Sequence, residues 1–226
     1  MKTVVVTGIG RGLGKAIHDL LCDKKTEQYH FVFVSRRSQT ALQSSENITY
    51  VNLDFDEPAF DTDVLTINPH SDCVIFVNNA GIVEPIMPAA AIDFYSFEHA
   101  IRVNCWAPLK ICRHLAALSL EHGIPLNVIN ISSGAASRAI RGWLAYCVSK
   151  ASAKMSLDVL AAENPHVSVT HFDPGVMDTD MQGTIRAQSP DVMPDVGVFI
   201  GFKDNLRLKE TSAVAAEVIQ MFGVEK

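Results

Sequence analysis

The sequence lacks a long hydrophobic run and an excess of basic residues. Its most apolar stretch, from Cys73 to Val83, is interrupted by Asn78 and Asn79 and is far shorter than the roughly 20 residues that cross a bilayer. Lysines and arginines number 19 against 25 aspartates and glutamates, so the formal net charge is −6. A surface of clustered cations for nucleic-acid phosphates is therefore excluded. We expect neither a membrane nor a nucleic acid as partner.

Disulfide and metal signals are also missing. The five cysteines are odd in number and contain no Cys-x-x-Cys pair, which predicts reduced thiols rather than a disulfide framework or a zinc site. The eight histidines show no metal-ligand spacing, so we expect no metal. The apolar run at the N-terminus stops after three valines, too short for the core of a signal peptide. These features favour a cytoplasmic protein.

Short β-branched runs alternate with helical stretches along all 226 residues. Continuous apolar strands separated by helices predict an α/β fold, a doubly wound parallel sheet (Rossmann fold) in a single domain over residues 1–226. The strands are expected at Thr3–Thr7, Phe31–Ser35, Ile48–Leu53, Cys73–Val77, Asn127–Ile131 and Val167–Phe172. The helices are expected at Leu13–Lys24, Glu57–Leu65, Phe94–Glu121, Trp143–Glu163 and Ser212–Phe222.

Two places depart from regular periodicity. The segment from about 180 to 208 carries Pro190 and Pro194 and several glycines, which is typical of a long loop or helical flap over a substrate site. Pro108 falls inside the helical pattern of Phe94–Glu121, so we expect a kink or an early break there.

A glycine-rich turn directly follows the first strand and opens the first helix: Thr7-Gly8-Ile9-Gly10-Arg11-Gly12-Leu13-Gly14. In such a turn Gly8 permits the tight bend, Gly12 lets the backbone approach a pyrophosphate, and Gly14 allows close packing of helix on strand. Unpaired N–H groups and the positive end of the helix dipole then face the phosphates. Glycines also serve ordinary turns, but a strand–turn–helix context predicts nucleotide binding.

The end of the second strand indicates which dinucleotide is bound. An NAD enzyme usually places a carboxylate there, whereas this chain has Ser35, Arg36 and Arg37, with Arg11 nearby in the glycine turn. A guanidinium can hold a 2′-phosphate through two hydrogen bonds. This favours NADP(H), although Arg37 could equally be a solvated surface residue.

A second motif, Tyr146-x-x-x-Lys150, carries acid–base chemistry. Residues four apart on a helix share a face, so both side chains would point into one site. A phenol with a pKa of about 10 is a poor catalyst at neutral pH, and a neighbouring ammonium lowers that pKa by favouring the phenolate. Ser133, after the fifth strand, could hold a carbonyl oxygen, or it could simply cap a turn.

Together these motifs resemble the classical short-chain dehydrogenase/reductase family. The residues that carry the resemblance, in the family's order, are Thr7-Gly8-x-x-x-Gly12-x-Gly14, Asn78-Asn79-Ala80-Gly81, Asn104, Ser133, Tyr146-x-x-x-Lys150 and Pro174-Gly175 with Thr179. The resemblance covers nearly the whole chain and implies NADPH-dependent reduction of a carbonyl to an alcohol.

The resemblance also implies roles for single residues. Tyr146 would donate the proton, Ser133 would polarise the carbonyl, Lys150 would bind the nicotinamide ribose and tune Tyr146, and Asn104 would support a proton relay through water. Asp54 would lie against the adenine and Asn79 near the adenine ribose. The cofactor-binding set predicted from the motifs and the resemblance is Gly8, Arg11, Gly12, Leu13, Gly14, Ser35, Arg36, Arg37, Asp54, Asn79, Ala80, Gly81, Tyr146, Lys150, Pro174, Gly175, Val176 and Thr179.

Within the family, the chain is similar to the sepiapterin reductase and benzil reductase branch. The motifs Gly142-Trp143-x-x-Tyr146-Cys147 and Asp178-Thr179-Asp180-Met181-Gln182 carry this likeness, which implies reduction of one carbonyl of a vicinal dicarbonyl. Substrate-binding residues would be Ser133, Tyr146 and Trp143, the last as an apolar wall or as ordinary core packing.

Three further expectations follow. Sepiapterin reductases continue into another strand, whereas here no last strand is evident before Lys226, which favours a simpler diketone over a pterin. The long helices Phe94–Glu121 and Trp143–Glu163 could pack into a homodimer. The alternative function is a non-catalytic NADP(H) sensor, which would need the glycine turn but not the proton donor.

Overall fold

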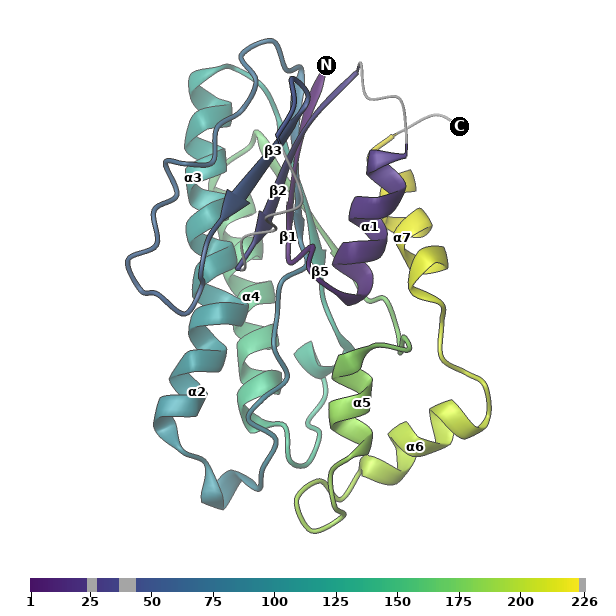
Figure 1. Ribbon diagram of the computed structural model, residues 1–226. Coiled ribbons are helices and arrows are strands. Elements are labelled where there is room, and N and C mark those ends of the chain that lie inside the picture. Colours follow the sequence, from purple (N-terminus) through teal and green to yellow (C-terminus); the bar gives the residue numbers. More distant parts are fainter. Residues whose placement is uncertain (24–27, 37–43, 224–226) are drawn as a thin grey trace.

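Six parallel strands form one sheet in the order β3-β2-β1-β4-β5-β6 (Figure 1). The computed structural model describes residues 1–23, 28–36 and 44–223. The strands are β1 Lys2–Thr7, β2 Tyr29–Ser35, β3 Ile48–Asn52, β4 Cys73–Asn78, β5 Leu126–Ile131 and β6 Val167–Phe172. All six predicted strands, and the doubly wound parallel sheet, are confirmed. Among the described residues, no strand follows β6.

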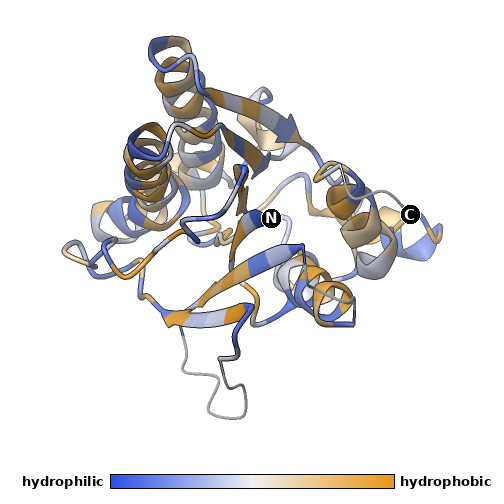
Figure 2. Cartoon of the chain, turned by 90° about the horizontal axis from the view of Figure 1, so that it is seen from above, coloured by the Kyte–Doolittle hydropathy of each residue, from blue (hydrophilic) through white to orange (hydrophobic). Residues whose placement is uncertain are grey.

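Helices cover both faces of this sheet. They are α1 Gly12–Cys22, α2 Phe94–Ile101, α3 Ala107–Glu121, α4 Leu144–Glu163, α5 Asp180–Arg186, α6 Val196–Asp204 and α7 Thr211–Gln220, with 3-10 turns at Ala89–Ala91 and Gly134–Ala136. α1 packs beside α7 on one face, and α3 beside α4 on the other (Figures 1 and 2). None of the helices in the described ranges is long and apolar enough to cross a membrane.

The two faces of β1 supply two separate hydrophobic cores. Val4 and Val6 point towards α1 and α7, whereas Val5 points towards α3 and α4, and none of the three is exposed. Successive side chains of a strand alternate between faces, so a run of valines fits a strand that is covered on both sides. The glycine turn therefore starts from a fully buried strand end.

The expected helix at Glu57–Leu65 is wrong. This segment forms hydrogen-bonded turns instead, in which the Asp61 carboxylate accepts the N–H of Asp63 at 2.9 Å. Local side-chain bonds of this kind compete with helix formation, and Pro58 removes a donor as well. Phe60 and Leu65 still pack into the core on the α3 side, which explains the apolar spacing that suggested a helix.

The expected long helix Phe94–Glu121 is interrupted. One turn of π-helix, Arg102–Trp106, separates α2 from α3, and Pro108 lies in the first turn of α3. Proline has no N–H to donate to the carbonyl four residues earlier, so the α-helical ladder cannot continue through this point. The break predicted at Pro108 is confirmed. It takes the form of the π turn just before this proline, and the π turn contains Asn104.

The segment expected as a flap contains two short helices, α5 and α6, which pack against each other. Figure 1 shows them beyond the carboxyl ends of the strands. Arg141, just before α4, ties this segment down because its guanidinium donates to Asp195 at 2.6 Å. Ile185 on α5 and Met193 in the loop between α5 and α6 are both buried. The carboxyl ends of the strands thus have a packed cover.

Candidate active site

A cavity of about 1030 Å³ opens at the carboxyl ends of the strands. It is lined by every described residue of the predicted site except Gly14 and Asn104, which lie directly behind its wall. Arg37 falls outside the described residues. The lining residues from that prediction are Gly8, Arg11, Gly12, Leu13, Ser35, Arg36, Asp54, Asn79, Ala80, Gly81, Ser133, Trp143, Tyr146, Lys150, Pro174, Gly175, Val176 and Thr179.

Glycines at three positions of the turn between β1 and α1 are required by geometry. Gly8 and Gly12 have positive φ angles of 76° and 55°, a region that side chains with a Cβ rarely occupy. A Cβ on Gly14 would lie 2.1 Å from the Gly8 carbonyl oxygen, closer than any side chain can come. The N-terminus of α1 therefore sits directly on the turn.

Hydrogen bonds from β4 fasten the same turn. The Asn79 amide donates to the carbonyl oxygens of Thr7 at 3.0 Å and Gly8 at 3.3 Å. In return, the Thr7 hydroxyl accepts the backbone N–H groups of Asn79 and Ala80, each at 3.1 Å. The sequence placed Asn79 near the adenine ribose; the structure shows that its side-chain amide is engaged in holding the turn.

The N-terminus of α1 suits a phosphate. Its N-cap, Arg11, makes no side-chain capping bond, and the first turn holds no acidic residue. The first N–H groups of a helix have no intrahelical acceptor, so they point unpaired towards the cavity with the positive end of the helix dipole. Because Gly12 leaves room for close approach, the residues present fit the pyrophosphate of a dinucleotide.

The end of the cavity beneath β2 and β3 carries a cation and a carboxylate. Arg36 lies directly after β2 and Asp54 two residues after β3, and both line the wall. The Asp54 carboxylate accepts the N–H of Asp56 at 3.0 Å through one oxygen, which leaves its other oxygen for a ligand. At the position where an NAD enzyme carries its acid, this chain therefore presents serine and arginine.

The opposite end holds Tyr146, on the first turn of α4. Its phenol is buried and hydrogen-bonds with Ser133, and Trp143 packs edge-on to its ring at a centroid distance of 5.2 Å. Burial raises the pKa of Tyr146 to about 12, opposed by the Ser133 bond and reinforced by the negative charge of Asp173. The sequence predicted that Lys150 lowers this pKa, but Lys150 is not among the groups that shift it, and the phenol keeps its proton at neutral pH.

Lys150 is the one described lysine that is buried, with only 8% of its surface exposed. Its ammonium donates to the Ile131 carbonyl at 3.0 Å and lies 5.9 Å from the centre of the Tyr146 ring. Burial lowers the pKa of Lys150 to about 8, because a charge is costly to remove from water. The ammonium is still mostly charged at pH 7 and faces the phenol.

Asn104 is held by the π turn behind the cavity wall. Its side chain accepts the Ile82 N–H at 2.9 Å and donates to the Ile82 carbonyl at 2.8 Å and to the Ser149 hydroxyl at 3.0 Å. The side-chain amide is therefore fully engaged. Its backbone carbonyl, in contrast, lacks the donor that an α-helix would supply four residues on, because that residue is Pro108.

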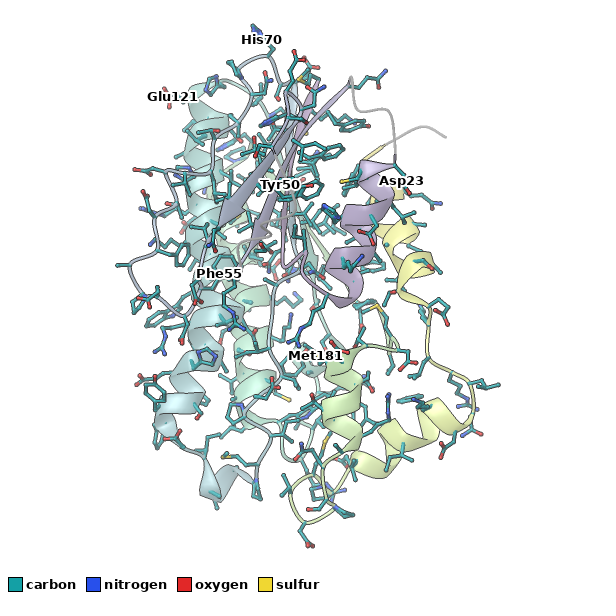
Figure 3. The ribbon with its side chains drawn as sticks, viewed as in Figure 1. Asp23, Tyr50, Phe55, His70, Glu121 and Met181 are labelled. Atoms are coloured by element: carbon teal, nitrogen blue, oxygen red, sulfur yellow. The ribbon has the colours of Figure 1, made fainter. Side chains whose placement is uncertain are left out.

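The cover of the cavity supplies residues that the sequence did not single out. Phe199 on α6 packs against Trp143 in a tilted arrangement, with a centroid distance of 5.0 Å and an interplanar angle of 46°, and Phe202 and Met181 also line the cavity. Met181 at the start of α5 and Phe55 after β3 both line the cavity, and Figure 3 labels the two side chains. The spacing of Val196 and Phe199, three apart, was a helical signal that the prolines and glycines around it obscured.

This arrangement of a parallel Rossmann sheet, a phosphate-binding turn and a Ser–Tyr–Lys cluster defines an oxidoreductase that acts on carbonyl or hydroxyl groups. A family model described as short chain dehydrogenase matches residues 2–190, and the chain belongs to that family. Members of this family use NAD(P)(H), which agrees with the phosphate site at α1.

Relatives with known names support the narrower resemblance. The chain is 29% identical to a benzil reductase ((S)-benzoin forming) of Bacillus cereus, over 100% of this chain and 96% of that protein. A sepiapterin reductase of Bos taurus is 34% identical over 54% of this chain and 46% of that protein. Among solved structures, the KRED1-Pglu enzyme superposes with a TM-score of 0.81 at 26% identity, covering 98% of this chain and 94% of that one.

Burial of the Lys150 ammonium predicts a measurable cost in stability. The folded pKa of about 8 lies below the ordinary 10.5, so the penalty is complete below pH 8 and disappears as pH rises to 10.5. Lys150→Met should therefore raise the free energy of unfolding by about 2–3 kcal/mol at pH 7 and by much less at pH 10. Urea denaturation of both proteins at the two pH values measures this.

Lys154→Met is the matched control, because Lys154 lies one turn further along α4 and is 44% exposed. We expect this substitution to change stability by less than about 0.5 kcal/mol at either pH. If the Lys150→Met difference were equal at pH 7 and pH 10, buried charge would not be its cause.

Proposed function

We propose that the protein is an NADPH-dependent carbonyl reductase that transfers hydride to one carbonyl of a vicinal dicarbonyl compound. The observation that carries the proposal is one cavity with the phosphate-binding turn at one end and Tyr146, Ser133 and Lys150 at the other. A molecule as long as a dinucleotide would reach from Arg36 to Lys150, with its reactive ring beside the phenol.

Tyr146 and Ser133 would bind and protonate the substrate. The bound cofactor supplies hydride to the carbonyl carbon. Both hydroxyls share a hydrogen bond, so a carbonyl oxygen placed between them would accept from each. With its pKa raised to about 12, the phenol remains protonated across the neutral range and can donate its proton as negative charge develops on that oxygen.

Lys150 and Asn104 would restore the proton. A phenolate formed in a buried site needs a nearby positive charge, which the Lys150 ammonium supplies from one turn along α4. Since the side-chain amide of Asn104 is engaged with Ile82 and Ser149, a relay through water would use its backbone carbonyl. Pro108 supports this because it has no N–H to donate to that carbonyl, as the residue four positions along an α-helix normally would.

Aromatic and apolar walls support a vicinal dicarbonyl as substrate. Trp143 and Phe199 form one side of the cavity next to Tyr146, and both are buried. A flat diketone with apolar substituents would pack against these rings. The name of the Bacillus cereus relative, a benzil reductase, is consistent with this shape.

NADPH oxidation by the purified protein tests the proposal. We expect turnover with benzil and with a small aliphatic vicinal diketone, weaker turnover with sepiapterin, and very little with simple mono-ketones, followed as loss of NADPH absorbance. Turnover of mono-ketones alone would contradict the substrate class. Tight NADPH binding without turnover of any of these compounds would instead favour a sensor of the NADP(H) pool.

Tyr146→Phe tests the proton donor. We expect NADPH to bind with unchanged affinity while kcat falls by about 10²- to 10⁴-fold, the usual contribution of a general acid. Tyr95→Phe is the control. It also removes one hydroxyl, but from a side chain that is 72% exposed on α2. Turnover in Tyr146→Phe equal to that of the control would exclude the mechanism.

Arg36→Asp tests cofactor choice. The substitution replaces a cation that would hold the 2′-phosphate by a repelling carboxylate, so the Kd for NADPH should rise roughly tenfold more than the Kd for NADH. Arg207→Asp introduces the same change of charge at an exposed position that does not line the cavity. Equal losses for both cofactors would mean that Arg36 does not distinguish them.

A homodimer is part of the same proposal. Four large apolar side chains are exposed on α3, on α4 and on the π turn before α3: Trp106, Leu120, Met155 and Val159. A second copy of the chain could cover them, because α3 and α4 are neighbours. Sedimentation equilibrium should give a molecular mass twice that of one chain. The Met155→Glu variant should give the mass of a single chain. A wild-type protein that sediments as a monomer at micromolar concentration would contradict this.

A cytoplasmic location completes the proposal. All five cysteines are free thiols in the structure, including the exposed Cys22. Free thiols are the ordinary state in a reducing compartment, where NADPH is also available.

A further inference from the structure

One histidine of the cavity wall has no role in the reaction proposed above. His99 lies on the last turn of α2, beside the part of the cavity formed by Asp54 and Phe55 after β3. Its side chain is 28% exposed, so the ring is held in the wall with one edge open. Neither the glycine turn nor the Ser–Tyr–Lys cluster touches it in the described part of the chain.

A carboxylate fixes the orientation of this ring. Nδ1 of His99 donates to Oδ1 of Asp56 at 2.6 Å, and the same oxygen accepts from Nη2 of Arg102 at 3.0 Å. These two bonds hold the pKa of Asp56 below its ordinary value, so the carboxylate is ionised and can only accept. In the neutral ring the proton must then sit on Nδ1, which leaves Nε2 as a hydrogen-bond acceptor.

Nε2 of His99 has no hydrogen-bond partner among the described residues. Around it the wall is apolar, because Leu53 and Val103 are buried there and Phe55 adds an aromatic ring. Such a slot accepts a flat heteroaromatic ring, and one fixed acceptor in it selects for a donor on the edge of that ring. Asp54 offers its remaining carboxylate oxygen from the neighbouring loop.

We propose that His99 recognises the adenine base of the cofactor. Its Nε2 accepts a hydrogen bond from an N–H of the 6-amino group. This inference rests on the proposed dinucleotide binding. A 6-amino group has two N–H donors, so His99 can take one while Asp54 takes the other. A purine with a 6-oxo group presents an acceptor at the same place, opposite an acceptor on the protein.

The competing interpretation is purely structural. The bonds of Asp56 to His99 and Arg102 also tie the loop after β3 to α2, and a loop tie would stabilise the site for any base. The two interpretations differ in one respect. If His99 recognises the base, its loss changes the preference for adenine over hypoxanthine. If His99 only anchors the loop after β3 to α2, its loss weakens the binding of both cofactors equally.

The experiment measures the Kd of NADPH and of nicotinamide hypoxanthine dinucleotide phosphate in its reduced form, from the fluorescence of the bound nicotinamide at pH 8. We expect the wild-type protein to bind the adenine form about tenfold more tightly, the combined effect of the hydrogen bonds to His99 and Asp54. In His99→Ala the ratio of the two Kd values should fall to about three, the part that Asp54 retains. His99→Phe, which keeps a flat ring without nitrogen, should give the same low ratio.

Two further variants separate the causes. Asp56→Asn keeps the imidazole but no longer fixes its proton on Nδ1, so we expect an intermediate ratio. His114→Ala is the matched control, because His114 also faces an acid, Asp63 at 3.6 Å, but does not line the cavity; its ratio should stay near ten.

The outcomes are distinct. A ratio that stays near ten in both His99 variants, with both Kd values raised together, would overturn the inference in favour of the loop tie. A wild-type protein that binds neither cofactor would overturn the proposed function itself, and the inference with it.

Discussion

The contact between Gly14 and the carbonyl of Gly8 is the constraint on which the site depends. Because no Cβ separates them, α1 starts directly on the end of β1 and brings its unpaired N–H groups to the cavity. Asn79 then bonds the same turn to the end of β4, the next strand of the sheet. The next wall is built outward from this junction, since β5 pairs with β4 and α4 packs against α3 and against β6 on the far side of β5.

The sequence predicted the sheet well because buried parallel strands consist of short runs rich in β-branched residues, as in Val4–Val6 and Val32–Val34. It failed at Glu57–Leu65, where apolar spacing suggested a helix but Pro58 and the Asp61 side chain favour turns. The site was predictable where function depends on fixed spacing, as for Tyr146 and Lys150. The role proposed for His99 was not, because a histidine becomes informative only when Asp56, distant in sequence, is seen beside it.

Electrostatic cost is concentrated at one end of the cavity. The same burial that keeps the Tyr146 phenol protonated also opposes the charge on Lys150, so both groups are held away from their ordinary pKa values. In the proposed mechanism, a site that favours the neutral phenol in the resting state and uses an ammonium to receive negative charge would gain reactivity at the expense of stability. The hydrogen bond from Lys150 to the Ile131 carbonyl offsets part of this cost.

The cavity lining begins at Gly8 and ends at Phe202, almost the full span of the chain. The glycine turn is therefore synthesised long before the pocket can close, because α5 and α6, which cover the pocket, come near the end of the chain. Once the chain is complete, a ligand that binds only the closed form raises the free energy of unfolding by its binding free energy. The cellular supply of such a ligand would then help to set how long the finished protein survives proteolysis.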